Sequence, residues 1–387
     1  MTVNSDAKVV MLEHSEAKVS LYGTYLATYL NILSRVPSIQ RIFLFDLMCG
    51  EGIYENGGKG SPVIATEVIK NHYFSNNQSC PNITLWFNDK EMSQIEKDIS
   101  KVDRVKRVVE RVHLPPNVTP KYFMEDYDQI HPRALRLAKG TANSKSLFFI
   151  DPYGYKDISP LHIKETLEGG NSEVLLFLPI SHMYRFAAKA MESSFPGSAP
   201  LENFLRELFG AKQPRFQSPL NFVEQTKAQF RALLSAMHIF VDTFTIERDN
   251  SNVYCLFFFT SHIRGYEKML ETKWALDSES GQGFRLQQGP QLFSAMELAG
   301  YPDKLYDFIA SDSFRTNNDI HRFGLENGFL PKHSNRILRD WLETRLDFER
   351  FALDSKPLRG KSTYIDNKDR TVAFRFRPSL FDEQEVV

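Results

Sequence analysis

The sequence predicts an α/β protein with a doubly wound, mostly parallel sheet that contains one antiparallel strand, followed by a winged-helix-like region. Short continuous apolar runs alternate with helix-like segments, which is typical of parallel strands covered on both faces. Two longer strand-like runs then flank the turn-like sequence DNSN, and such a hairpin places one antiparallel strand in the sheet. After about residue 312 the order changes to helix, helix, hairpin, which is the order at the end of a winged helix.

An N-terminal helical segment is expected over 1–40, because apolar residues in 18–35 recur at helical spacing. The α/β domain is expected over 41–280, with a helical insertion at about 181–237 that contains proline and glycine breakers. The five parallel strands are expected at the apolar runs 42–45, 83–87, 121–124, 146–150 and 173–178, and the hairpin at 238–249 and 252–262.

The C-terminal part begins with a helical linker, expected over 281–312. A winged-helix-like domain is expected over 313–378, and an acidic tail over 379–387. Within that domain the sequence predicts helices at 317–328 and 333–353 and a two-stranded hairpin at 361–378, around Asn367 and Lys368.

Composition excludes several classes of protein. The 387 residues are 42% hydrophobic and 25% charged, with a net charge of −1, so no overall field attracts nucleic acid or a membrane. The three cysteines have no metal-ligand spacing, which argues against a zinc site or a disulfide framework and favours a reducing compartment. The N-terminus has no signal-like pattern, and no apolar run approaches the length of a membrane span. A cytoplasmic protein without a metal is therefore expected.

The stretch IFLFDLMCGEG, residues 42–52, ends an apolar strand in a carboxylate and a glycine turn. Two common nucleotide-binding patterns fail here. A phosphate-binding loop would need glycine at Ile53 and serine or threonine at Gly60, and the dinucleotide pattern would need glycine at Glu55.

A third pattern, Asp-x-x-x-Gly-x-Gly, fits Asp46, Gly50 and Gly52. It suits S-adenosylmethionine (SAM), whose short chain carries a sulfonium, an ammonium and a carboxylate. Glycines let the backbone approach such a ligand closely, and the aspartate supplies negative charge near its positive end. A tight structural turn is the alternative for this stretch taken alone.

Acidic residues follow three more of the expected strands. Asp89, after Asn88, suits ribose hydroxyls; Asp126, after Glu125, could accept from an adenine amino group; and Asp151 ends the fourth run. Open α/β sheets bind ligands at this edge, so acids in register there favour the cofactor hypothesis. Each acid alone could instead be a helix cap or a solvated turn.

The stretch IDPYGY resembles the Asp/Asn-Pro-Pro-Tyr/Phe motif of methyltransferases that act on exocyclic amines of bases. Asp151 and the carbonyl of Pro152 could accept both N–H bonds of such an amine, and Tyr153 or Tyr155 could stack on an extruded base. Because a tyrosine replaces the second proline and a glycine follows, guanine remains possible as well as adenine. A structural Pro-Gly turn is the alternative.

These stretches together resemble the three-Cys-motif partner protein family, TcmP. The resemblance rests on DLMCGEGIYENGGKGSP, FNDKE, FIDPYGY and FFFTSHIRGYEKM, with Lys18 and Tyr29 on the N-terminal helix, and covers about residues 15–275. Met48 and Cys49 depart from the Phe-Ala pair usual in the family. The resemblance implies a class I methyltransferase-like Rossmann fold and a radical-SAM-like partner protein, to which the three cysteines of the family name belong.

Basic residues concentrate near the C-terminus, where aromatic residues interleave with them. The candidate nucleic-acid-binding residues are Lys361, Lys368, Arg370, Arg375 and Arg377. A solvated hairpin is the alternative for this region. A second basic stretch, Lys97 to Arg111, is expected on the solvated face of a helix.

The favoured hypothesis is a SAM-dependent methyltransferase that acts on an exocyclic amino group of a nucleic-acid base, adenine or guanine. The alternative is a non-catalytic or weakly catalytic protein that binds SAM and nucleic acid and serves a three-cysteine radical-SAM-like partner. The sequence leaves open DNA against RNA, the base, activity of the chain alone and the oligomeric state.

Overall fold

The computed structural model describes residues 9–76, 80–152, 158–192, 199–210, 214–249, 252–277, 283–285, 300–353, 358, 360, 362–365 and 371–377. The chain forms two compact units. The first consists of 1–276 with 282–289, and the second of 277–281 with 290–387.

The first unit is built on one sheet with the strand order β3-β2-β1-β4-β5-β7-β6-β8. Strands β1 to β5 run parallel, and β7 lies antiparallel between β5 and β6. This confirms the predicted fold class, a doubly wound sheet with one antiparallel strand. The strands are β1 (Arg41–Asp46), β2 (Asn82–Asn88), β3 (Val118–Phe123), β4 (Ser144–Ile150), β5 (Ser172–Leu178), β6 (Phe240–Asp249), β7 (Asn252–Thr260) and β8 (Gly283–Arg285).

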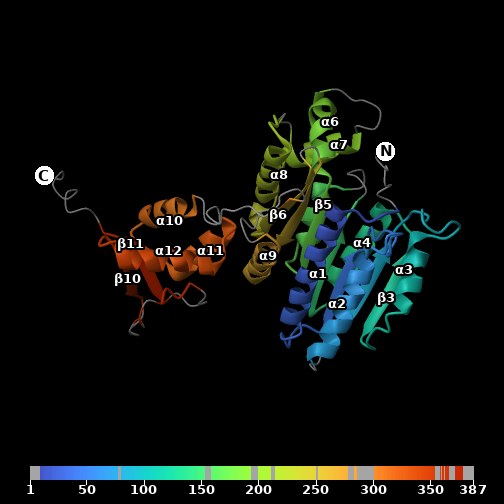
Figure 1. Ribbon diagram of the computed structural model, residues 1–387, viewed down its shortest axis with the longest axis horizontal. Helices are drawn as coiled ribbons and strands as arrows, with labels where there is room; N and C mark the ends of the chain where they lie inside the picture. Colours follow the sequence, from blue (N-terminus) through green and yellow to red (C-terminus); the bar gives the residue numbers. More distant parts are fainter. Residues whose placement is uncertain are drawn as a thin grey trace. The chain divides into compact units, whose positions relative to one another are not determined.

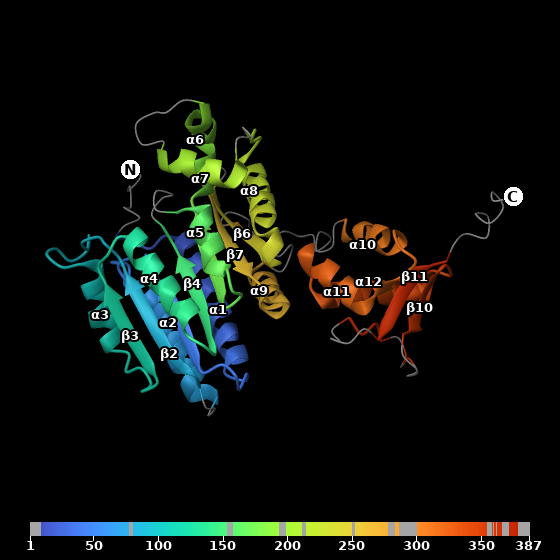
Figure 2. The same cartoon turned by 180° about the vertical axis from the view of Figure 1, so that it is seen from behind.

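Helices cover both faces of this sheet (Figures 1 and 2). One face carries α1 (Glu13–Leu33), α2 (Ser61–Asn76), α3 (Lys101–Glu110) and α9 (Ile263–Leu276). The other carries α4 (Tyr127–Gly140), α5 (Pro160–Leu167) and α8 (Pro219–Leu233). The chain between β5 and β6 also forms α6 (Ile180–Glu192), α7 (Ala199–Phe209) and the 3-10 turn η1 (Ser235–Met237).

Alternation along β4 shows why the apolar runs are continuous. Phe149 points to one face and stacks on Tyr22 of α1 with ring centroids 4.4 Å apart, whereas Phe148 points to the other face and meets His131 of α4 at 6.2 Å. A strand segment buried on both faces therefore carries apolar residues at successive positions, as 147–150 of β4 does. The expected run at 121–124 begins earlier, at Val118, because β3 is an edge strand that accommodates Pro120.

In the second unit, the described helices pack beside a small antiparallel sheet of order β10-β11-β9 (Figure 1). Its elements are α10 (Tyr301–Ala310), β9 (Arg315–Thr316), α11 (Asn317–Glu326), α12 (Pro331–Thr344), β10 (Phe348–Ala352) and β11 (Val372–Phe376).

Two sequence predictions for this unit are wrong. The helix expected over 333–353 ends at Thr344, and its last part forms β10. The partner of β11 is therefore β10, not a strand inside 361–378. The reason is aromatic packing: Phe348 is 5% exposed, and its ring lies 5.4 Å from Trp341 and 4.9 Å from Phe376.

Among the described residues, no helix combines the length and the apolar composition that crossing a membrane requires.

Candidate functional site

The carboxyl ends of β1, β2, β3 and β4 bring the predicted acidic residues to one edge of the sheet. The register places Asp46 beside Phe87 of β2 and Phe149 of β4, so the residues that follow these strands emerge at the same level. The charges of Asp151 and Asp89 both raise the pKa of Asp46, as expected for neighbouring carboxylates.

Asp46 is a buried carboxylate without a hydrogen-bond partner among the described residues. It is 3% exposed, and neither side-chain oxygen has a hydrogen bond of normal geometry to a described residue, although the Ser61 hydroxyl lies close enough to lower the pKa of Asp46. Burial raises its pKa from 3.8 to about 8, although the nearby Ser61 hydroxyl and the Lys18 ammonium lower it. Asp46 is therefore mostly protonated at neutral pH, and a cationic group placed beside it would stabilise the ionised form.

The glycine turn after β1 adopts a backbone conformation that requires glycine. Gly50 and Gly52 have φ of 66° and 76°, in the left-handed region. A Cβ added to Gly52 would also come within 3.1 Å of Val105 on α3. Gly52 is thus explained by backbone geometry and packing alone, whatever ligand the turn binds.

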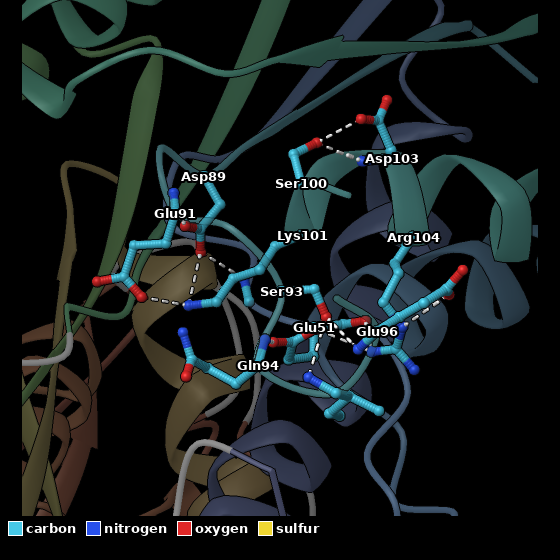
Figure 3. Close-up of polar contacts among 12 residues, drawn as sticks. Glu51, Asp89, Glu91, Ser93, Gln94, Glu96, Ser100, Lys101, Asp103 and Arg104 are labelled. Atoms are coloured by element: carbon cyan, nitrogen blue, oxygen red, sulfur yellow. Dashed lines mark hydrogen bonds and ion pairs between the residues drawn. The ribbon is translucent and has the colours of Figure 1, made fainter. Parts of the chain in front are cut away.

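Asp89 is fixed to this turn by three groups. Its Oδ2 accepts a hydrogen bond from the Gly50 N–H at 3.0 Å, and its Oδ1 accepts from the Glu91 N–H at 2.9 Å. The Lys101 ammonium lies 3.9 Å from Oδ2 and 2.6 Å from the Glu91 carboxylate (Figure 3). Burial raises the pKa of Asp89, whereas Lys101 and the two backbone N–H groups lower it.

Glu51, inside the glycine turn, is completely buried, and its carboxylate accepts several hydrogen bonds (Figure 3). It accepts hydrogen bonds from the Ser93 hydroxyl at 2.8 Å, from the Gln94 N–H at 2.7 Å and from Arg104 at 2.9 Å. These bonds join the turn after β1 to the segment after β2 and to α3. The turn is therefore rigidly positioned.

The sequence prediction for the basic stretch Lys97 to Arg111 is wrong for two of its residues. Lys101 has no exposed surface, and the Arg104 side chain is 14% exposed. Both face the acids described above rather than solvent. Sequence reasoning missed Glu51 and Lys101, because a charged residue in an amphipathic segment carries no local signal that a partner distant in sequence will bury it.

Asn88 holds the ends of three strands at fixed spacing. Its side-chain amide donates to the carbonyls of Leu47, at 2.9 Å, and Glu125, at 3.0 Å, and its oxygen accepts from the Glu125 N–H at 3.0 Å. Asp126, which follows Glu125, lies at the rim of this edge. Its side chain is 59% exposed and forms an ion pair with Lys90 at 2.7 Å.

Asp151 is paired with a lysine from the N-terminal helix. Lys18 donates to its Oδ2, and the same ammonium lies 4.5 Å from the centre of the Phe177 ring. The two side chains are only 10% and 20% exposed. No described residue bonds to Oδ1 of Asp151. Pro152 is buried, whereas Tyr153 and Tyr155 lie outside the described residues.

Two further tyrosines approach the acids. Burial raises the pKa of Tyr54, and Asp151, Glu51 and Asp46 raise it further; burial and Asp46 raise that of Tyr22. Both side chains therefore lie close to the acidic edge. Neither tyrosine was predicted from the sequence. Tyr54 lies in a loop without a recognisable pattern, and Tyr22 is one of many buried residues of α1.

The loop that carries Tyr54 is fastened to the N-terminal segment. Asn56 accepts from the Met11 N–H at 3.2 Å and donates to the Met11 carbonyl at 2.9 Å, and the Glu55 N–H donates to the Val9 carbonyl at 2.9 Å. Gly58 is required here, since a Cβ would lie 2.4 Å from Met11 Cβ.

Within the described part of the chain, no group of three or more His, Cys, Asp or Glu could hold a metal ion.

No family model and no curated protein matches the sequence. Solved structures that share features of its fold include an O-methyltransferase from Bacillus cereus in complex with SAH, which is 11% identical with a TM-score of 0.33 and aligns over 64% of this chain and 86% of its own. Trm1 from Pyrococcus horikoshii with SAM is 14% identical with a TM-score of 0.35, over 75% of this chain and 68% of its own. The O-methyltransferase TomG from Streptomyces achromogenes, in complex with SAM, is 12% identical with a TM-score of 0.34, over 65% of this chain and 92% of its own. The sheet of this chain has the strand order of a methyltransferase-like Rossmann fold, with the antiparallel β7 next to β5.

Proposed function

We propose that this protein is a SAM-dependent methyltransferase whose acceptor is an exocyclic amino group of a nucleic-acid base, adenine or guanine. One observation carries the proposal. Asp46 is a buried carboxylate without a hydrogen bond of normal geometry to any described residue, at the edge of the sheet where such folds bind ligands and next to the strand that precedes Asp151. A buried polar group of this kind is costly unless a ligand satisfies it.

The residues at this edge fit the parts of the cofactor. Asp46 suits the cationic end of SAM, beside the turn formed by Gly50 and Gly52. Each Asp89 oxygen accepts one backbone N–H and keeps a further acceptor position, which suits ribose hydroxyls. Asp126, exposed at the rim, suits the adenine end. Bound there, SAM would supply an electrophilic methyl group.

In this proposal Asp151 orients the acceptor amine. Its Oδ1 and the carbonyl of Pro152 accept the two N–H bonds, so that the nitrogen lone pair points toward the methyl group. Lys18 holds the other oxygen and fixes the carboxylate. Tyr153 and Tyr155 remain candidates for stacking on the base. Positioning of this kind can account for a large part of a rate enhancement.

The second unit supports a nucleic-acid substrate through its architecture. The order of its described elements is helix, strand, helix, helix, strand, strand, with β11 between β10 and β9, and this order resembles that of a winged helix. Of the candidate wing residues, Lys361, Lys368 and Arg370 lie outside the described residues. Arg375 and Arg377 both pair with Glu349 of β10, each at 2.5 Å, so part of the charge of the wing is compensated.

The proposal is tested by transfer of a tritiated methyl group from SAM to mixed DNA and RNA. Asp151→Ala should leave SAM affinity nearly unchanged and lower transfer by about a hundredfold, because a misplaced acceptor reacts slowly. Asp151→Asn should retain more activity than Asp151→Ala, since the amide oxygen still accepts one N–H bond. Equal activity of wild type and both variants would contradict the role of Asp151.

A second candidate function is a protein that binds SAM and nucleic acid and delivers them to a three-cysteine radical-SAM-like partner. The observation in its favour is that Lys18 already occupies Asp151. The variant Lys18→Met keeps an unbranched side chain of similar length and removes the charge. If Lys18 positions a catalytic Asp151, this variant should bind SAM and transfer methyl groups at least about tenfold more slowly. A wild-type protein that binds SAM but transfers nothing, with or without the partner, would favour the second candidate.

A further inference from the structure

We propose that the exposed face of α12 binds in the major groove of duplex DNA. This deepens the proposed function and rests on it, because it names the form of nucleic acid and the helix that contacts it. The proposal draws on the connection between α11 and α12, on the packing that orients α12, and on the distribution of charge along its exposed face.

The helices α11 and α12 are joined as in a helix-turn-helix. Helix α11 ends at Glu326 and α12 begins at Pro331, so residues 327–330 form the turn. Gly328 adopts φ of 86°, which the turn requires and which glycine permits. Helix pairs with a turn of this length that contains glycine are typical of DNA-binding proteins, where the second helix enters the major groove.

Close packing fixes which face of α12 points outward. A Cβ added to Gly324 of α11 would lie 2.8 Å from the Tyr301 hydroxyl and 3.0 Å from Ser334 Oγ, so α10, α11 and α12 meet tightly at this point. Tyr301 and Ser334 are hydrogen-bonded at 2.6 Å. The buried residues of α12 are His333, Ser334, Ile337, Leu338 and Trp341.

The outward face is basic over the N-terminal half of α12. Lys332, Arg336 and Arg339 are all exposed, and their spacing of four and three residues places them in one stripe. Residues 331–339 contain no acid, whereas Asp340 and Glu343 follow toward the C-terminal end. Recognition helices contact base edges with their N-terminal residues, so the charge lies where the phosphates and bases would be.

Duplex DNA fits this face better than duplex RNA. The major groove of B-form DNA admits an α-helix, whereas the deep, narrow major groove of A-form RNA does not. In the wing strands, Glu349 pairs with both Arg375 and Arg377. In the full chain, whose net charge is −1, the stripe on α12 is a local basic surface on an otherwise balanced protein.

The test measures binding of the full chain to labelled duplexes of about two helical turns by fluorescence anisotropy. Lys332→Glu and Arg339→Glu should each weaken DNA binding, and the double variant should bind at least about tenfold more weakly. The dependence of affinity on salt should become shallower by about 2 in the double logarithmic slope, because about two fewer phosphates are neutralised. Lys304→Glu, a charge reversal at an exposed position of α10, is the matched control for each single variant and should bind as wild type does.

Wild-type affinity of the double variant, with unchanged salt dependence, would overturn the proposal, as would equally tight binding of an RNA duplex of the same sequence. Circular dichroism of each variant verifies that the second unit remains folded. The outcome is separable from that of the proposed function. Loss of DNA binding in the double variant with no methyl transfer by wild type would contradict only the methyltransferase. Methyl transfer that persists in the double variant, on DNA bound as tightly as by wild type, would contradict only the role of α12.

Discussion

Replacing Asp46 by asparagine should stabilise the ligand-free protein while abolishing its affinity for SAM. The substitution keeps the size and shape of the side chain and removes the ionisable group. In the folded protein the pKa of Asp46 is about 8, against an ordinary value of 3.8. The unfolded chain therefore ionises this group over a pH range in which the folded chain keeps it protonated, and ionisation favours unfolding.

The magnitude follows from the difference in pKa. A pH of 7 lies about three units above the ordinary pKa of Asp46, so the unfolded chain ionises this group whereas the folded chain mostly does not. The difference corresponds to about 4 kcal/mol of lost stability. The loss is absent below pH 3.8, grows as the pH rises, and levels off above about pH 8. At pH 4.5 it amounts to only about 1 kcal/mol. The gain from Asp46→Asn should therefore be large at pH 7 and small at pH 4.5.

Urea denaturation at both pH values, followed by circular dichroism, measures this gain. Asp128→Asn, on the exposed side of α4, controls for the loss of a surface carboxylate. Calorimetry should find that wild type releases up to about one proton when SAM binds at pH 7, because the cationic ligand ionises Asp46. An asparagine variant that is no more stable than wild type at pH 7, or whose gain is the same at both pH values, would refute the reasoning.

Two further predictions concern buried groups in the first unit. Lys101→Met should lower the free energy of unfolding by roughly 3–5 kcal/mol, since it leaves the buried carboxylate of Asp89 without its cation. Lys106→Met, on the exposed side of α3, is the matched control, and a loss below about 1 kcal/mol for Lys101→Met would contradict the prediction. His131, which is 1% exposed and hydrogen-bonded to Thr166 at 2.8 Å, has its pKa lowered to about 4, chiefly by burial. Above about pH 6.5 His131 is neutral in both states, but at lower pH the unfolded chain protonates it first, so the free energy of unfolding falls by about 3 kcal/mol as the pH drops through 4. The variant His131→Gln should therefore lose less stability in acid than wild type does. An equal loss of stability in acid would show that His131 is not its cause.

The strands of the first unit could be predicted because their signal is local. A strand buried on both faces carries a continuous apolar run, and such runs occupy 42–45 of β1, 147–150 of β4 and 174–178 of β5. The acids that follow such strands could then be placed at one edge from topology alone. The strand β10 was missed because the sequence FERFA continues the spacing of the preceding helix, and only its pairing with β11 decides its conformation.

The parts of the site that the sequence did not predict all depend on partners distant along the chain. Lys18 meets Asp151 across 133 residues, and Glu51 meets Arg104 across 53. No short pattern encodes such pairs. The tight turn at Gly50 and Gly52 could be predicted, because a backbone with positive φ favours glycine and the sequence shows glycine there.

The bonds around Glu51 have a consequence for how fast and how tightly a ligand would bind. A loop that must order itself on binding loses conformational entropy at that moment, and its affinity falls accordingly. Here the Ser93 hydroxyl, the Gln94 N–H and Arg104 already restrain the turn through one buried carboxylate. The entropy is lost when the chain folds, so an incoming molecule meets a preformed surface, and neither a slow closing step nor a large unfavourable entropy should accompany its capture at this turn.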